Sequence, residues 1–301
     1  MKPHTKAEPQ PFLQPIDARR RRLAAGLALA GLAAAAPAGA QQQSPATPVR
    51  KPAHRAWRFL INEAVTGESN LFILTTRYKP LADYVTEQVK GRPTIGIEPV
   101  VDIQRFISLA QGQPRPELVF GKSVNQLAKL VRDSGYQPLV RRADPYKAAF
   151  IVAKDSPIKT LADASKAKAK IIMPDAFAAT TAVARAELRR QNVGEIEIVH
   201  TKFQEAVAQQ IKNGFGQVGV VNPTTARKWV EEGGRVLAET QPVVNWSLLA
   251  SPTLAHDEVQ RLREALMAMN SQPTLMNGLG VKEWALADKK DYLALLDYTK
   301  E

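Results

Sequence analysis

The feature that most restricts the fold of this sequence is a repeated succession of short apolar segments, each followed by a polar turn and an amphipathic segment. The segment E-L-V-F-G at 117–121, for example, is followed by Lys122 and a helical pattern over 123–134 that stops at Gly135. Short apolar runs predict strands, and apolar residues three and four apart predict helices. Strands that alternate with helices favour mostly parallel sheets covered by helices. The sequence therefore predicts an α/β fold.

The same succession continues along the chain. We expect strands at residues 58–64, 94–100, 117–121, 137–142, 148–154, 170–173, 195–200, 218–221, 235–239 and 244–250. We expect helices at residues 80–90, 102–111, 123–134, 180–190, 204–212, 223–232 and 257–269, a short helix after Thr160, and further helices up to Tyr298.

Residues 1–40 have the pattern of a secretory signal peptide. Four arginines at 19–22 precede an uncharged stretch of Ala, Leu and Gly at 23–36, and Ala38-Gly39-Ala40 follows. The stretch is shorter than the roughly 20 residues that a bilayer-spanning helix needs, which disfavours the alternative of a membrane anchor. We therefore expect export to the periplasm and cleavage after Ala40. Both the twin-arginine route and the general route stay open.

Residues 41–56 are rich in Gln, Pro, Ser, Thr and Ala, a composition typical of a flexible linker. The remaining residues, 57–301, are numerous enough to form two lobes. The chain contains no cysteine, which excludes a lipoprotein anchor, disulfides, cysteine-ligated metals and thiol catalysis.

The formal net charge of +12 raises the question of an anionic partner. After Arg50 and Lys51, basic residues occur singly or as scattered doublets, which is typical of solvated surface rather than of a nucleic-acid interface. We expect a positive field that attracts small anions.

Four turns between an apolar segment and a helix have the character of an anion site. They are residues 121–123, 178–181, 201–204 and 222–225. In parallel α/β sheets, ligands bind beyond the carboxyl ends of the strands, where helix N-termini present free N–H groups. The alternative is that Ser123, Thr180 and Thr224 are ordinary helix caps without a ligand.

Several segments resemble the periplasmic phosphate/phosphonate-type binding proteins of ABC importers. E-L-V-F-G at 117–121 is similar to the family's D-I-A-W-F-G, and A-F-I-V-A-K-D-S-P-I-K-T-L-A-D at 149–163 to its S-V-I-I-V-R-K-D-S-x-I-x-S-L-A-D-L. Q-E-A-V-A-Q-Q-I-K-N-G-F-G-Q-V at 204–218 is similar to H-E-A-V-x-x-A-V-x-x-G-x-V, with two extra residues in the turn. The resemblance covers about residues 57–270.

This resemblance implies a type II periplasmic-binding fold, with two α/β lobes joined by two crossover strands and a ligand clamped between them. Lobe one would comprise residues 57–140 and 240–301, and lobe two residues 141–239. Carried over position by position, the ligand would meet Lys122 and Ser123 in the first lobe, Tyr146 before the crossover strand, and Thr180 and Thr181 in the second lobe.

The sequence departs from the family pattern at the anion loop. Where the family has roughly P-D-S-T-S-G-Y, residues 174–181 read P-D-A-F-A-A-T-T, so most hydroxyls are missing. Each lost hydrogen bond to a charged group costs about 1.5–3 kcal/mol. This disfavours phosphate itself and favours a larger organic anion that packs on Phe177 or Phe203, with Asn222 and Thr224 adding polar contacts.

No catalytic constellation, cofactor motif or metal-ligand spacing occurs in the sequence, so we expect a binding protein rather than an enzyme, without cofactor or metal. The expected partners of a monomeric carrier are a small anionic solute and an ABC permease in the inner membrane. The alternative is a periplasmic sensing module that signals to a membrane sensor kinase, because both roles use one cleft and one closed state.

Overall fold

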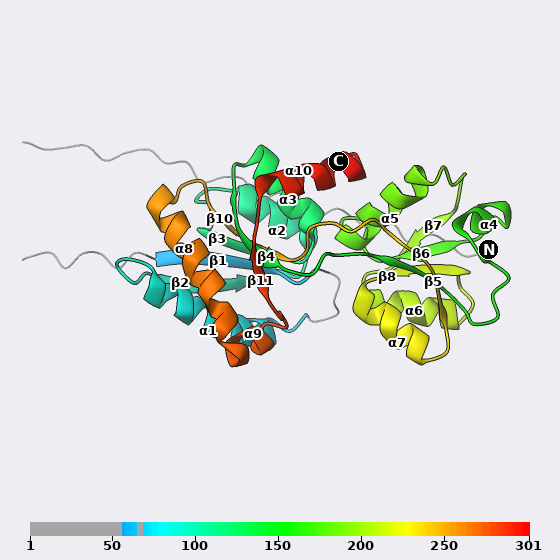
Figure 1. Ribbon diagram of the computed structural model, residues 1–301, viewed down its shortest axis with the longest axis horizontal. Helices are drawn as coiled ribbons and strands as arrows, with labels where there is room; N and C mark the ends of the chain where they lie inside the picture. Colours follow the sequence, from blue (N-terminus) through cyan, green and yellow to red (C-terminus); the bar gives the residue numbers. More distant parts are fainter. Residues whose placement is uncertain (1–55, 65–68) are drawn as a thin grey trace, which may run out of the picture. The chain divides into compact units, whose positions relative to one another are not determined.

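The strands of the protein form two separate sheets in the computed structural model, which describes residues 56–64 and 69–301 (Figure 1). The six-stranded sheet has the order β11-β4-β10-β3-β1-β2, with β1 Ala56–Asn62, β2 Thr94–Pro99, β3 Leu118–Gly121, β4 Gln137–Arg142, β10 Ser247–Ala250 and β11 Trp284–Leu286. The five-stranded sheet has the order β7-β6-β8-β5-β9, with β5 Ala149–Val152, β6 Ile171–Met173, β7 Ile198–His200, β8 Val218–Val221 and β9 Arg235–Glu239.

Both sheets are mixed, and most of their strands run in one direction. In the first sheet β1 pairs in parallel with β2 and β3, whereas β10 and β11 run against their neighbours. In the second sheet β6 pairs in parallel with β7 and β8, and β5 runs against β8 and β9. The α/β prediction is therefore confirmed, and two of the three strands that run against the others, β5 and β10, are those that directly follow the connections between the sheets.

Helices follow most strands, as the alternating pattern predicted. They are α1 Leu71–Gln88, α2 Ile103–Gln111, α3 Val124–Asp133, α4 Leu161–Lys166, α5 Ala179–Arg190, α6 Gln204–Lys212, α7 Pro223–Glu231, α8 His256–Ala268, α9 Pro273–Gly278 and α10 Lys289–Thr299. No helix within the described residues is long and apolar enough to span a membrane.

Helix α1 begins nine residues before the start that Pro80 suggested. Asn70 caps its first turn by accepting hydrogen bonds from the backbone N–H groups of Phe72 and Ile73. Pro80 removes one backbone hydrogen bond. The helix continues through it because Leu74 and Tyr78 are buried before the proline, on the face that packs against the first sheet.

The predicted signal peptide, residues 1–40, lies outside the described residues, as does the predicted linker up to residue 55. Ala56, the last residue of that predicted linker, is the first residue of β1.

Two connections link the sheets, one from β4 to β5 and one from β9 to β10. They run antiparallel and meet at Tyr146 and Val243, whose backbone N–H and carbonyl groups exchange two hydrogen bonds of 2.9 Å. The resemblance implied two crossovers between the lobes, with Tyr146 just before one of them, and Tyr146 lies in the first connection.

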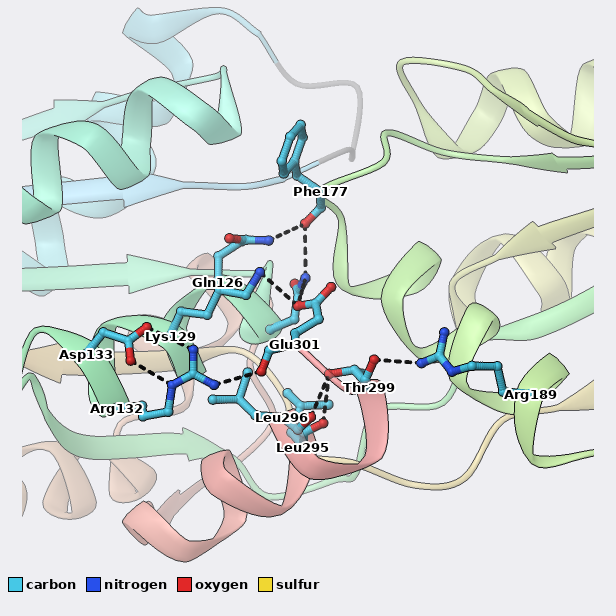
Figure 2. A network of polar contacts seen from close by, with 11 residues as sticks. Gln126, Lys129, Arg132, Asp133, Phe177, Arg189, Leu295, Leu296, Thr299 and Glu301 are labelled. Carbon is cyan, nitrogen blue, oxygen red and sulfur yellow. Dashed lines mark hydrogen bonds and ion pairs between the residues drawn. The ribbon is translucent and has the colours of Figure 1, made fainter.

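The C-terminal helix α10 is a third link between the elements of the two sheets. It packs on α3, which follows a strand of the first sheet, and on α5, which follows a strand of the second (Figure 1). A single buried cluster includes Leu127 of α3, Val183 of α5 and Leu295 of α10. Figure 2 shows the polar contacts around the end of α10, where Lys129 and Arg132 of α3 contact Glu301.

Candidate ligand-binding site

A cavity of about 740 Å³ lies between the ends of strands from both sheets. It is lined by Ala64, Lys122, Arg142, Ala143, Asp144, Tyr146, Ala178, Ala179, Thr180, Gln204, Glu205, Asn222, Pro223, Thr224, Thr225, Arg227, Lys228, Asn245, Trp246, Lys282 and Glu283. The lining thus joins the turn after β3, the first connection and the starts of three helices of the second sheet.

Two of these helices begin without a side-chain cap. The residues before α5 and α6 are Ala178 and Phe203, and neither side chain accepts a hydrogen bond from its helix. The first N–H groups of a helix have no intrahelical partner and carry a partial positive charge. Ala179 and Gln204 at these two starts line the cavity, and the wall suits an anion best at α5, because the first turn of α6 carries the carboxylate of Glu205.

The third helix, α7, is capped in the ordinary way. The side chain of Asn222 accepts a 2.8 Å hydrogen bond from the N–H of Thr225, and Pro223 occupies the first helical position. The cap interpretation, which the sequence left open for Thr224, therefore applies instead to Asn222, two residues earlier.

A series of buried hydrogen bonds links Tyr146, in the β4–β5 connection, to the first residues of α5 and α6. The hydroxyl oxygens of Tyr146 and Thr180 lie 2.6 Å apart. The side-chain amide of Gln204 donates a 2.7 Å hydrogen bond to the Thr180 hydroxyl and accepts one of 3.1 Å from the N–H of Asn222. Burial raises the pKa of Tyr146, so its phenol stays neutral and available as a donor.

The opposite wall contains a buried ion pair. Lys122 Nζ lies 2.8 Å from Glu63, whose other oxygen accepts hydrogen bonds from Arg77 and Tyr78. Burial alone would raise the pKa of Glu63, but the charge of Lys122 and the three hydrogen bonds outweigh it and lower that pKa to about 2. Lys122 is therefore already neutralised by a protein carboxylate.

Trp246 forms the aromatic part of this wall. Lys122 Nζ lies 4.0 Å and the Arg142 guanidinium 4.5 Å from the centroid of its ring. Arg142 also forms two hydrogen bonds, of 2.9 and 2.6 Å, with the carboxylate of Asp144. The cations of this wall are thus held by carboxylates and by an indole.

The structure brings together five of the nine residues that the sequence predicted for the site. The cavity lining includes Lys122, Tyr146, Thr180, Asn222 and Thr224.

The other four predicted residues, Ser123, Phe177, Thr181 and Phe203, are outside the lining. Ser123 is buried, and its hydroxyl has no hydrogen-bond partner among the described residues. Thr181 donates its hydroxyl proton to the carbonyl of Pro174. The carbonyl of Phe177 accepts hydrogen bonds from Asn125 and Gln126 of α3 (Figure 2).

Sequence reasoning missed Arg142, Gln204, Asn245 and Trp246. Gln204 was part of the predicted anion-site turn 201–204 but not among the predicted site residues, and Trp246 was noticed only as part of a predicted strand. Gln204 contacts Thr180 and Trp246 contacts Lys122 across long stretches of sequence, and the pattern of neighbouring residues carries no signal of that proximity.

Within the described residues, no group of three His, Asp or Glu side chains could hold a metal ion. His200 lies outside the lining, where its ring contacts Arg185 and the carbonyl of Pro174.

The comparison with known families gives an extensive match. The family model of the ABC transporter phosphonate periplasmic substrate-binding proteins matches residues 73–292. No curated protein matches the sequence.

Solved structures of low sequence identity share the fold. XAC2383 from Xanthomonas citri, bound to ATP, has a TM-score of 0.68 and 16% identity, over 81% of this chain and 98% of that one. PhnD1 from Prochlorococcus marinus, in complex with methylphosphonate, has a TM-score of 0.66 and 11% identity, over 82% and 97%. A binding protein component of an ABC phosphonate transporter from Pseudomonas aeruginosa has a TM-score of 0.63 and 14% identity, over 81% and 85%.

Two mixed sheets flanked by helices, in an arrangement shared with these structures, confirm the predicted type II periplasmic-binding fold. The family match extends over most of the described residues and includes the cavity-lining segments from Lys122 to Glu283. The chain therefore belongs to the phosphonate-type periplasmic substrate-binding proteins of ABC transporters.

Proposed function

We propose that this protein captures a small organic oxyanion in the 740 Å³ cavity and delivers it to an ABC permease in the inner membrane. The observation that carries the proposal is the convergence of two uncapped helix starts, those of α5 and α6, with the hydroxyl pair of Tyr146 and Thr180. Free N–H groups and a neutral hydroxyl are donors that an oxyanion accepts well.

The ligand that we propose is larger than phosphate. A cavity of this volume lies within the range of about 300–1,000 Å³ that is usual for drug-sized ligands. The indole of Trp246 offers an apolar surface for a carbon skeleton. The two similar proteins solved with methylphosphonate and with ATP support an oxyanion that carries an organic part.

The predicted site residues keep different roles in this proposal. Thr180, Tyr146, Asn222 and Thr224 would contact the ligand directly, and Lys122 would act through its ion pair and through Trp246. The four outside the lining (Ser123, Phe177, Thr181 and Phe203) would support the site from behind, and Trp246 would take the packing role expected of the two phenylalanines.

We propose the two lobes that the sequence indicated, with a small change of boundary. Each sheet uses strands from one proposed lobe, except that β4 of the first sheet continues to Arg142, two residues beyond the predicted border at 140. We therefore place the end of the first segment of lobe one after Arg142. Rotation about the two connections would clamp the ligand.

Further parts of the proposal concern the mature protein. It would act as a monomer, without cofactor, metal or catalytic activity, after export and cleavage between Ala40 and Gln41. Mass spectrometry of the protein recovered from the periplasm would show an N-terminus at Gln41, whereas a membrane-bound species that retains Met1 would contradict the cleavage.

A thermal-shift panel tests the function. The panel contains inorganic phosphate, phosphite, alkylphosphonates, sulfonates and carboxylates. A ligand at 100 times its dissociation constant stabilises the folded state by about 2.7 kcal/mol, which is a clear rise in melting temperature. An organic oxyanion should give the largest rise. The tightest binding by inorganic phosphate would contradict the larger ligand, and no rise with any oxyanion would contradict the function.

A further inference from the structure

The side chain of Gln204 has only one orientation that satisfies its neighbours. Gln204 is the first residue of α6 and is 2% exposed. One end of its amide lies 3.1 Å from the backbone nitrogen of Asn222, and the other end 2.7 Å from the hydroxyl oxygen of Thr180. A backbone N–H can only donate, so the amide oxygen must face Asn222. The amide nitrogen must then face Thr180 and donate to it.

This orientation determines how the protons of the next two groups are used. The hydroxyls of Thr180 and Tyr146 carry two protons, and their 2.6 Å contact uses one of them, whichever group donates. Gln204 supplies its own proton to Thr180, so it consumes neither. Exactly one hydroxyl proton of the pair is therefore left. Both side chains line the cavity, and each is less than one-tenth exposed.

We propose that Gln204 is a positioning residue that keeps one hydroxyl proton of the Tyr146–Thr180 pair available for an unprotonated ligand oxygen. The inference rests on the proposed function, because it assumes that an oxyanion occupies this cavity. It adds a selection rule, since the ligand atom at this position has to be a hydrogen-bond acceptor. Gln204 acts through Thr180. It sets which group donates in the hydrogen bonds among Gln204, Thr180 and Tyr146, and it adds no contact of its own with the ligand.

Replacement of the Gln204 donor by an acceptor should reverse the direction of the hydrogen bonds to Thr180 and Tyr146. In Gln204→Glu at neutral pH the carboxylate cannot donate, so Thr180 donates to it and Tyr146 donates to Thr180. No hydroxyl proton is then left for the ligand. Protonation of the new carboxyl group restores a donor of nearly the same shape. Burial raises the pKa of a carboxylic acid, which brings this protonation into an accessible range.

Calorimetric titration with methanesulfonate and methylphosphonate tests this reversal, and methanesulfonate keeps its charge throughout the range. At about pH 8 the Gln204→Glu variant should bind about 10- to 100-fold more weakly than the wild type, the loss expected for a hydrogen bond to a charged group. Towards about pH 5 the ratio of the two affinities should shrink again as the carboxyl group is protonated. Gln204→Met neither donates to Thr180 nor takes a proton from it, so one hydroxyl proton stays available, and this variant should lose much less affinity than Gln204→Glu at about pH 8 and depend little on pH.

The wild type measured at each pH corrects for the other charged groups that face this part of the cavity from neighbouring elements. They are Lys122, Arg142, Asp144, Glu205, Arg227, Lys228, Lys282 and Glu283. A Gln204→Glu variant that binds like the wild type at about pH 8, or whose loss does not depend on pH, would overturn the inference.

A second measurement needs no ligand. Neutron diffraction from crystals of the wild-type protein distinguishes nitrogen from oxygen and locates deuterium. We expect the Gln204 nitrogen towards Thr180 and one unshared deuteron of the hydroxyl pair directed into the cavity. An amide oxygen facing Thr180 would overturn the inference even if oxyanions bind. A correct arrangement in a protein that binds no member of the panel would instead overturn only the proposed function.

Discussion

Arg189 of α5 donates a 2.6 Å hydrogen bond to the backbone carbonyl of Thr299, the last residue of α10 (Figure 2). One residue earlier, the hydroxyl of Tyr298 donates a 2.8 Å hydrogen bond to Glu187 of α5. The end of α10 is thus fixed to a helix of the second sheet, while its other face packs on α3 of the first. A rotation about the two connections that moves α5 away from α10 has to break these two hydrogen bonds, whereas one that moves α10 together with α5 keeps them.

We predict that Tyr298→Phe destabilises the folded state by about 1.5–3 kcal/mol, the usual range for a hydrogen bond to a charged group. Glu187 would lose one of the donors that hold its carboxylate, whose side chain is 1% exposed. The matched control is Tyr84→Phe, because Tyr84 donates to the neutral carbonyl of Ala265, and its loss should cost only about 0.5–1.5 kcal/mol. Urea unfolding of both variants provides the comparison, and equal losses would contradict a special role for Tyr298.

The buried pair of Glu63 and Lys122 gives a second prediction. Glu63→Gln leaves Lys122, whose side chain is 9% exposed, without its carboxylate, and should destabilise the protein by about 3–5 kcal/mol. The double variant Glu63→Gln with Lys122→Met should recover part of this loss, because no uncompensated charge stays buried. Asp83→Asn removes an exposed ion pair with Lys79 as the control and should cost less than about 1 kcal/mol. Calorimetric melting decides, and a Glu63→Gln effect as small as the control would contradict the prediction.

Glu63 also predicts how stability responds to acid. Its pKa in the folded protein is about 2, below the 4.5 of a free glutamate, so the folded state holds the ionised form more strongly. The contribution is complete above the unfolded pKa of 4.5 and is lost as the pH falls through about 2. The free energy of unfolding, measured by denaturation at several pH values in this window, should therefore depend less on pH in Glu63→Gln than in the wild type. Parallel curves for the two proteins would assign the acid sensitivity to other groups.

The alternation of strands and helices could be predicted from the sequence because it depends on local patterns. The strand at 218–221 and the helix at 204–212 occur at the expected residues, since each is a single apolar run or face bounded by turn residues. The start of α1 could not be predicted, because burial of Tyr78 outweighs the local penalty of Pro80.

The site was predictable where a strand end leads into a helix, as at Thr180, and where the family resemblance supplied a position, as at Tyr146. Trp246 acquires its role from Lys122, in the turn after β3, and from Arg142, the last residue of β4, both distant from it in sequence. Such contacts depend on the tertiary arrangement, and the residues around Trp246 in the sequence do not reveal them.

Cysteine labelling can test the clamp motion directly, because the chain has no native cysteine. One spin label would replace Glu231 on α7, whose first residues line the cavity, and the other Asn277 on α9, which ends four residues before the lining residue Lys282; both positions are exposed. The tightest oxyanion of the panel should shorten and narrow the distance distribution between these labels. A second label pair, at Glu231 and at Asp297 on α10, shows whether α10 moves relative to α7. This measurement distinguishes loosening of α10 from rotation about the two connections. An unchanged Glu231–Asn277 distribution under saturating ligand would contradict the clamp.

The neighbouring residues Thr180 and Thr181 offer the sharpest separation of binding from stability. Thr180→Val removes the hydroxyl that joins Tyr146 and Gln204 at the cavity, so affinity for the best oxyanion should fall by about 10- to 100-fold. Thr181→Val removes only the bond to the carbonyl of Pro174, and it should cost about 0.5–1.5 kcal/mol of stability with affinity nearly unchanged. The two variants differ by one position in the same helix turn, and both side chains are buried, so each controls for packing effects of the other. Calorimetric titration gives the affinities and urea unfolding the stabilities. Equal losses of affinity in both variants would show that the helix start, rather than the Thr180 hydroxyl, holds the ligand, and unchanged affinity in Thr180→Val would contradict the anion site itself.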